Sequence, residues 1–98
     1  MTSGRSWSTY LVEHYQPGVT AEELERSATA VRDAALALEH AGQPTRFVSS
    51  TIVPADESFL CLLQASSERL VRETYAHAGI ACDRISIAIT TARGGEQP

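Results

Sequence analysis

The residues best suited to chemistry in this 98-residue chain are carboxylates and imidazoles, and no strict motif holds them together. Imidazole nitrogens and carboxylate oxygens are ligands for borderline divalent ions such as nickel and zinc. The sequence lacks a His-x-x-x-His or Cys-x-x-Cys pair that would fix two ligands locally. A metal site therefore depends on the fold to gather side chains from distant segments. The candidate ligands are Glu13, His14, Asp56, Glu57, His77 and Asp83.

Most of these candidates also have a purely structural interpretation. Asp56 and Glu57 suit a solvated turn, and His77 suits the negative end of a helix dipole. Glu13 stands in a segment of strand-forming residues, where acidic side chains are depleted. It either faces a cavity as a group suited to acid–base chemistry, or pairs with Arg46, Arg84 or another arginine. The candidate lining of such a cavity is Tyr10, Glu13 and Arg46, although Tyr10 could simply pack.

The first half of the chain predicts a strand followed by a helix. Residues 8–15 (STYLVEHY) are rich in aromatic and β-branched residues and are stopped by Pro17-Gly18. Thr20 and Glu23 then form a capping box that opens a helix. An apolar stripe follows at spacings of three and four residues, and Gly42 and Pro44 end it. The stripe consists of Leu24, Ala28, Val31, Ala35 and Leu38.

The second half predicts two strands, a helix and a fourth strand. Residues 45–53 and 58–65 alternate as strands, and the four residues between them suit a hairpin. Ser66 is the expected N-cap of a shorter helix that ends at Gly79. Residues 84–91 predict the last strand, because isoleucines recur at every second position.

The order β-α-β-β-α-β predicts an α+β ferredoxin-like fold, with a four-stranded antiparallel sheet in the order 4-1-3-2 and both helices on one face. The third strand is apolar on both faces, with Phe59, Cys61 and Leu63 on one face and Leu60 and Leu62 on the other, and the helices can cover only one of these faces. We therefore expect a homodimer in which a second copy covers that face; the alternative is an unusually apolar central strand in a monomer. This topology places the six candidate ligands at one pole of the domain.

Composition and charge bound the remaining possibilities. The eight basic residues, all arginine, and twelve acidic residues give a net charge of −4, which argues against nucleic acid as a partner. No apolar run approaches the roughly 20 residues of a membrane helix, and the start of the chain lacks a signal peptide's apolar region, so we expect a cytoplasmic protein.

We expect one domain over residues 8–91, a flexible N-terminus over 1–7 and a disordered tail over 92–98. Cys61 and Cys82 should be free, because two strand spacings of roughly 4.8 Å separate them.

Several short segments together resemble a family of small ferredoxin-like proteins catalogued as a domain of unknown function, whose best-described members are nickel-responsive, nickel-binding homodimers. The resemblance implies a homodimer and suggests binding of nickel, or of zinc, but implies no reaction. His14 and Tyr15-Gln16 depart from the family's pattern. The segments are Tyr10-Leu11-Val12-Glu13, Pro17-Gly18-Val19-Thr20, Ser50-Thr51-Ile52-Val53-Pro54, Asp56-Glu57, Cys61, Val71-Arg72-Glu73, Ala78-Gly79 and Asp83-Arg84.

Besides a structural or regulatory dimer without a ligand, two functional hypotheses follow from these observations. The first is a dimeric metal-binding protein concerned with nickel sequestration or response. The alternative is a small-molecule enzyme of the cyclase, isomerase or monooxygenase type, with its pocket between the sheets of a dimeric α/β barrel. Fold analogy alone supports this alternative.

Overall fold

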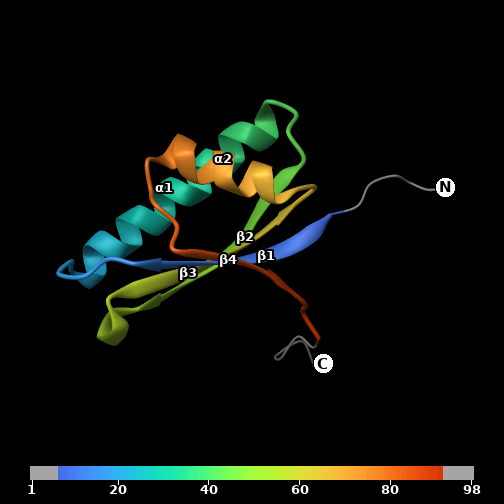
Figure 1. Ribbon diagram of the computed structural model, residues 1–98. Helices are drawn as coiled ribbons and strands as arrows, with labels where there is room; N and C mark the ends of the chain where they lie inside the picture. The colour runs from blue at the N-terminus through green and yellow to red at the C-terminus, as the bar shows by residue number, and fades with distance from the viewer. Residues whose placement is uncertain (1–6, 92–98) are drawn as a thin grey trace, which may run out of the picture.

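The alternation of strands and helices follows the predicted order β-α-β-β-α-β in the computed structural model, which describes residues 7–91. The predicted flexible N-terminus, apart from Trp7, and the predicted tail at 92–98 lie outside the described residues. Figure 1 shows the elements in chain order. They are β1 (Ser8–Tyr15), α1 (Ala21–His40), β2 (Thr45–Val53), the short 3-10 helix η1 (Pro54–Asp56), β3 (Ser58–Ala65), α2 (Glu68–Ala78) and β4 (Arg84–Ala88).

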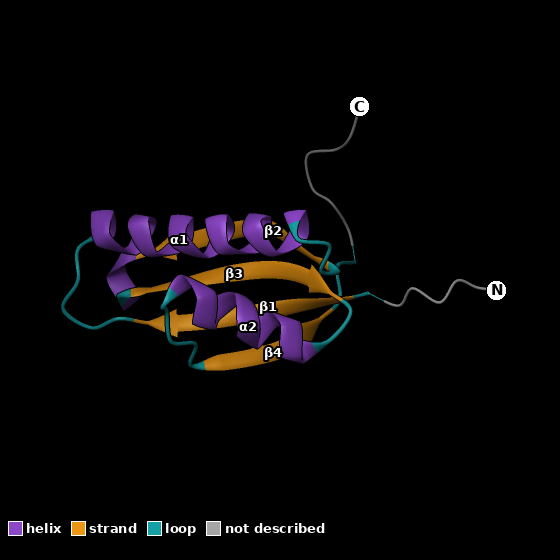
Figure 2. Ribbon diagram, turned by 90° about the horizontal axis from the view of Figure 1, so that it is seen from above, coloured by secondary structure: helices purple, strands orange, loops and turns teal. Residues whose placement is uncertain are grey.

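The sheet is antiparallel in the order β2-β3-β1-β4, which is the predicted order read from the other edge. Both helices cover one face of the sheet, here called the helix face, and leave the open face without a helix (Figures 1 and 2). The predicted ferredoxin-like α+β fold is therefore confirmed. Among residues 7–91, no helix is long and apolar enough to cross a membrane.

The core lies between the helix face and the two helices. Four members of the predicted stripe on α1 are buried, and Leu38 is half-buried at the end of the helix. Phe59, Cys61 and Leu63 of β3 are completely buried against them. Leu60 and Leu62 alternate with these residues and are half-exposed on the open face. The two-sided apolar character of β3 is thus real, and among residues 7–91 the helices cover only one side of it.

The first residues of the two helices show how well the sequence predicted each N-cap. Thr20 and Glu23 form the predicted capping box at the start of α1. The prediction of Ser66 as the N-cap of α2 was wrong by one residue, because the Ser67 hydroxyl accepts the Leu70 N–H at 3.3 Å. The backbone N–H of Ser66 instead donates to the carbonyl of Pro44 at 3.1 Å.

The last strand is shorter than predicted, ending at Ala88 rather than at residue 91. Its neighbour β1 explains this difference, because Ala88 pairs with Thr9 and only Ser8 of β1 precedes Thr9. Residues 89–91 therefore have almost no strand beside them. As predicted, Cys61 and Cys82 are both free, and burial raises the pKa of the Cys61 thiol to about 11.

Candidate functional site

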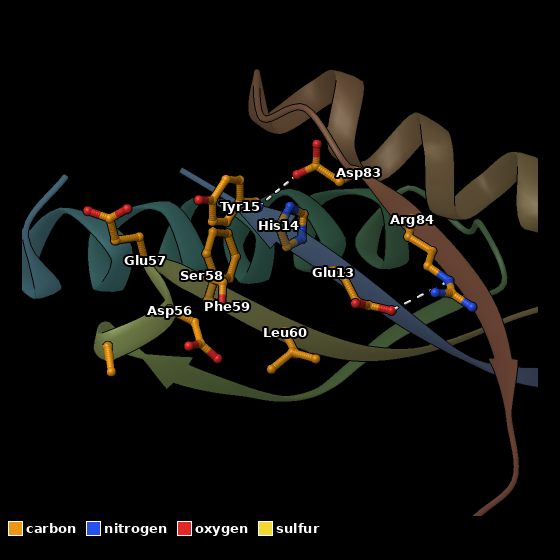
Figure 3. Close-up of a pocket in the computed structure, with 11 residues that line it drawn as sticks. Glu13, His14, Tyr15, Asp56, Glu57, Ser58, Phe59, Leu60, Asp83 and Arg84 are labelled. Carbon is orange, nitrogen blue, oxygen red and sulfur yellow. Dashed lines mark hydrogen bonds and ion pairs between the residues drawn. The ribbon is translucent and has the colours of Figure 1, made fainter. Parts of the chain in front are cut away.

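A hollow of about 480 Å³ lies at the end of the sheet where β1 finishes and β4 begins. Segments far apart in the sequence form its walls: the end of β1, the η1 turn with the start of β3, and the start of β4 (Figure 3). Among residues 7–91, four carboxylates and one guanidinium, that of Arg84, line it, and we call it the acidic hollow. It contains five of the six candidate ligands, namely Glu13, His14, Asp56, Glu57 and Asp83.

The sixth candidate, His77, lies elsewhere. It lines a smaller hollow with Asp33 and Ala34 of α1, on the outer side of the helix layer. The topology correctly brought the end of β1, the β2–β3 turn and the start of β4 together. It did not place the exposed His77 side chain in the same hollow, because α2 presents other residues to the sheet.

Three of the four carboxylates already have partners within the chain. Asp83 Oδ2 accepts the backbone N–H of Tyr15 at 2.7 Å, and Glu57 Oε2 accepts that of Gly18 at 3.2 Å. The first bond connects the start of β4 to the last residue of β1, and the second connects the η1 turn to the loop that follows β1. The exposed Asp56 has no hydrogen-bond or ion-pair partner among residues 7–91. Asp56 is therefore the carboxylate that is most available to an incoming cation.

Glu13 forms the ion pair that one interpretation of the sequence anticipated. Its Oε2 lies 3.7 Å from Nε of Arg84, and the two residues are directly paired across β1 and β4 (Figure 3). The Glu13 and Arg84 side chains are 42% and 72% exposed, so water screens the pair. The pair places a single positive charge at the rim of an otherwise negative hollow.

His14 is a buried residue of the core rather than an exposed ligand at the rim. The residue is 1% exposed, and its ring stacks on Phe59 and on Tyr75. Nδ1 lies 3.0 Å from the carbonyl oxygen of Ala81, which can only accept, so Nδ1 carries the proton and donates it. Burial lowers the pKa of His14, while the Ala81 carbonyl and the charge of Asp83 oppose that change. Nε2 is buried without a hydrogen-bond partner in the described part of the chain.

A divalent ion requires several ligand atoms that converge on one point. Among residues 7–91, no group of three or more His, Cys, Asp or Glu side chains is positioned to hold a metal ion. The acidic hollow thus concentrates negative charge without a ready-made set of converging ligands. Exposed carboxylates can rotate toward a cation, whereas His14 Nε2 is buried and the imidazole is held by stacking on Phe59 and Tyr75.

The predicted pocket of Tyr10, Glu13 and Arg46 is not assembled in the chain. Tyr10 is buried on the helix face. Because side chains alternate between the two faces along β1, Glu13 lies on the open face. Arg46 lies on β2, where it approaches Glu39 at 3.9 Å and stands 5.7 Å from the ring centroid of Trp7. These three side chains therefore lie in three different surroundings.

The sequence interpretation missed two residues that fix His14. Tyr75 and Ala81 contact it from α2 and from the segment that precedes β4. Tyr75 lies four residues after Val71, which is also buried on α2, so its burial could have been anticipated from helical spacing. Nothing in the sequence indicated that Tyr75 would stack on an imidazole.

Comparisons with known proteins agree with the fold. A family model described as "Nickel responsive protein SCO4226-like" matches residues 10–87. The crystal structure of SCO4226 from Streptomyces coelicolor A3(2) is similar, with a TM-score of 0.68 and 23% sequence identity. The similarity covers 87% of this chain and 100% of that one, and at this identity it shows the fold alone. Comparison with curated protein sequences gave no match.

Proposed function

The chain belongs to the nickel responsive protein SCO4226-like family, and we propose that it is a small cytoplasmic protein that binds nickel, or another divalent transition metal, as a homodimer for sequestration or response. The family match carries the proposal, because it covers residues 10–87 and so includes all six candidate ligands. The acidic hollow supports it with chemistry suited to a cation.

The hollow is the place where we expect the metal to bind. Four carboxylates face a single guanidinium there, so the local charge favours a cation. Carboxylate oxygens suit divalent ions, and Asp56 and Glu57 stand on a short turn where their side chains can adjust. We propose Glu13, Asp56, Glu57 and Asp83 as the ligands closest to the ion. Ligation by His14 or His77 would need more rearrangement.

A second copy on the open face is the proposed dimer contact. Leu11, Leu60 and Leu62 lie on the adjacent strands β1 and β3, are half-exposed, and form a continuous apolar stripe on that face. Apolar surface of this kind gains stability when a partner removes it from water. Glu13 and Leu60 line the acidic hollow from the same face, so a second copy there would lie beside the metal ligands.

Calorimetric titration of the full chain with NiCl₂ tests the metal proposal. Asp56→Asn and Asp83→Asn each remove one charge with little change in shape, and the amide that replaces the Asp83 carboxylate keeps an oxygen acceptor for the Tyr15 N–H. We expect each to weaken nickel binding by about tenfold. Asp33→Asn, a surface aspartate of α1 outside the hollow, is the matched control and should leave binding unchanged. Absence of heat with the wild type, or equal effects of all three variants, would refute the site.

Sedimentation velocity tests the dimer contact independently of metal. Leu62→Glu places a charge in the middle of the open face and should separate the two copies. Leu36→Glu is the control, because Leu36 is also an exposed leucine but lies on α1. A wild-type chain that sediments as a monomer, or a Leu62→Glu variant with the mass of the wild type, would contradict the proposal.

The enzyme alternative has less support. The residues expected to line its pocket do not lie together, and Glu13 pairs with Arg84 instead. We therefore propose no reaction for this chain.

A further inference from the structure

The two edges of the sheet are built differently. An edge strand exposes unpaired backbone N–H and C=O groups, and proteins usually blunt such an edge with a bulge, a charge or a proline. On β2 the pairing shifts register between Phe47 and Ser49, which leaves Val48 as a bulge. Arg46 adds a charge to this strand, and prolines flank it at positions 44 and 54. The β2 edge is thus guarded against pairing with another strand.

The β4 edge has neither a bulge nor a proline, and its one charged residue, Arg84, stands at the first position of the strand. Its register with β1 is continuous from Arg84 to Ala88. Residues 85–91 (ISIAITT) contain no charge and no proline, and five of the seven are β-branched residues that favour strands. No strand lies on the outer side of β4 in the part of the chain that the structure describes. This edge is therefore open to another strand of compatible sequence.

The isoleucines of this segment are exposed to an increasing degree along the chain. Ile85 packs partly against the core, whereas Ile87 is 69% exposed and Ile89 is 83% exposed. These last two are the most exposed large apolar side chains among residues 7–91. Burial of these two side chains would remove apolar surface from water, so the segment favours a covered state.

The isoleucines at positions 85, 87 and 89 are spaced symmetrically about Ile87. An antiparallel strand of the same sequence therefore matches them, and this favours a second copy of the chain as the partner. We propose that β4 pairs edge to edge, antiparallel, with β4 of a second copy of this chain, with Ile87 opposite the second copy's Ile87. Ile85 of each copy then lies opposite Ile89 of the other. Arg84 lies opposite Thr90, so no like charges meet.

Neighbouring registers lack this match. A two-residue shift in one direction sets Ile89 opposite Asp83, and a shift in the other direction sets Ile85 opposite Thr91. A shift of one residue would turn the two helix layers to opposite sides of the joint sheet. The register centred on Ile87 alone pairs every isoleucine with an isoleucine and keeps both helix layers on one side.

This contact is separate from the dimer on the open face and goes beyond the proposed function. It uses the edge of the sheet, and the open face stays available to a further copy. A chain that makes both contacts would assemble beyond a dimer. Loss of nickel binding in the variants of the acidic hollow would therefore leave the edge contact in place.

Disulfide trapping tests the register. In a Cys82→Ser background, Ile87→Cys puts two thiols on directly opposed residues, with Cα atoms about 4.5–5.5 Å apart, which a disulfide can bridge. Ala88→Cys is the control, because its two thiols would be diagonal neighbours about 7–8 Å apart. We expect at least a fivefold excess of the cross-linked species for Ile87→Cys, in the presence or absence of Leu62→Glu. Equal cross-linking, or more cross-linking at position 88, would overturn the proposal.

Sedimentation provides a second, independent measurement. Ile87→Lys adds a guarding charge at a position that is already exposed, so folding should be preserved. At a concentration where the wild type forms its largest species, we expect this variant to show half of that mass. Leu36→Lys, on α1, should behave as the wild type. An unchanged mass for Ile87→Lys would show that the edge is not a contact between copies.

Discussion

The imidazole of His14 lies nearly parallel to the ring of Phe59, with centroids 4.1 Å apart and an interplanar angle of 12°. The two residues are directly paired across β1 and β3. Tyr75 of α2 also stacks on the imidazole, at 4.7 Å. His14 Nδ1 donates to the Ala81 carbonyl, so one side chain connects two strands, a helix and the segment before β4. The wall of the acidic hollow therefore contains a buried imidazole whose neutral form is favoured by burial.

This arrangement predicts that acid destabilises the protein through His14. Burial lowers the pKa of His14 below the ordinary value of 6.5, so the unfolded chain binds a proton more readily than the folded chain. The free energy of unfolding should be full above about pH 6.5 and should fall as the pH drops through the interval down to the lowered pKa. Urea titrations at pH 7.5, 6.5 and 5.5 measure this slope.

The matched variants for that measurement are His14→Phe and His77→Gln. His14→Phe keeps a flat ring against Phe59 and should remove much of the slope between pH 7.5 and 5.5. His77 is exposed, and His77→Gln should keep the wild-type slope. If His14→Phe retains the full pH dependence, the buried imidazole is not its source.

Removal of the Arg84 charge should strengthen metal binding. Arg84 is the one guanidinium in the described part of the chain that lines the acidic hollow, and its partner Glu13 would be released to a cation. We expect Arg84→Gln to tighten nickel binding by about three- to tenfold at low salt. Because the ion pair is exposed, the free energy of unfolding should change by less than about 1 kcal/mol. Calorimetry and urea titration separate these effects, and weaker nickel binding would mean that Arg84 is not a competitor for the site.

The N-cap of α2 gives a prediction that separates two adjacent serines. Ser67→Ala removes the hydroxyl that accepts the Leu70 N–H and should lower the free energy of unfolding by about 1 kcal/mol. Ser66 uses only its backbone N–H, so Ser66→Ala should have a much smaller effect. The two variants differ by one position in the same turn, and thermal or urea unfolding compares them directly. Equal losses would indicate that the hydroxyl of Ser67 is not the stabilising group.

The sequence predicted those features that depend on neighbouring residues and missed those that depend on contacts with distant segments. Thr20, Glu23 and the stripe from Leu24 to Ala35 are local signals, and they predicted α1 correctly. Ser66 and Ser67 are adjacent residues of the same type, and only the folded structure distinguishes them, by the bond from the Ser66 N–H to Pro44 and the bond from the Leu70 N–H to the Ser67 hydroxyl. The end of β4 was set by the length of β1, which residues 84–91 do not encode.

At the candidate site, the sequence predicted which segments meet but not which face of the sheet each side chain occupies. The order of the elements predicted that residues 13, 14, 56, 57 and 83 would meet at one end of the sheet, and all five line the acidic hollow. Strand alternation then separates Glu13, on the open face, from His14, in the core. The sequence did not establish which of the two faces the helices would cover. The metal roles of these residues stay predictions.

Glu57 couples the strain of the η1 turn to the proposed metal site. Its backbone adopts the left-handed conformation, with φ of 52° and ψ of 43°, which is unfavourable for a residue that has a Cβ atom. Glu57→Gly should relieve this cost and raise the free energy of unfolding by up to about 1 kcal/mol, less the loss of the bond to the Gly18 N–H. The same variant should weaken nickel binding, because it removes a proposed ligand. Glu57→Gln keeps the backbone cost and should weaken nickel binding without the gain in stability. If Glu57→Gly binds nickel as the wild type does, the carboxylate is not a ligand, and the left-handed residue serves the turn alone.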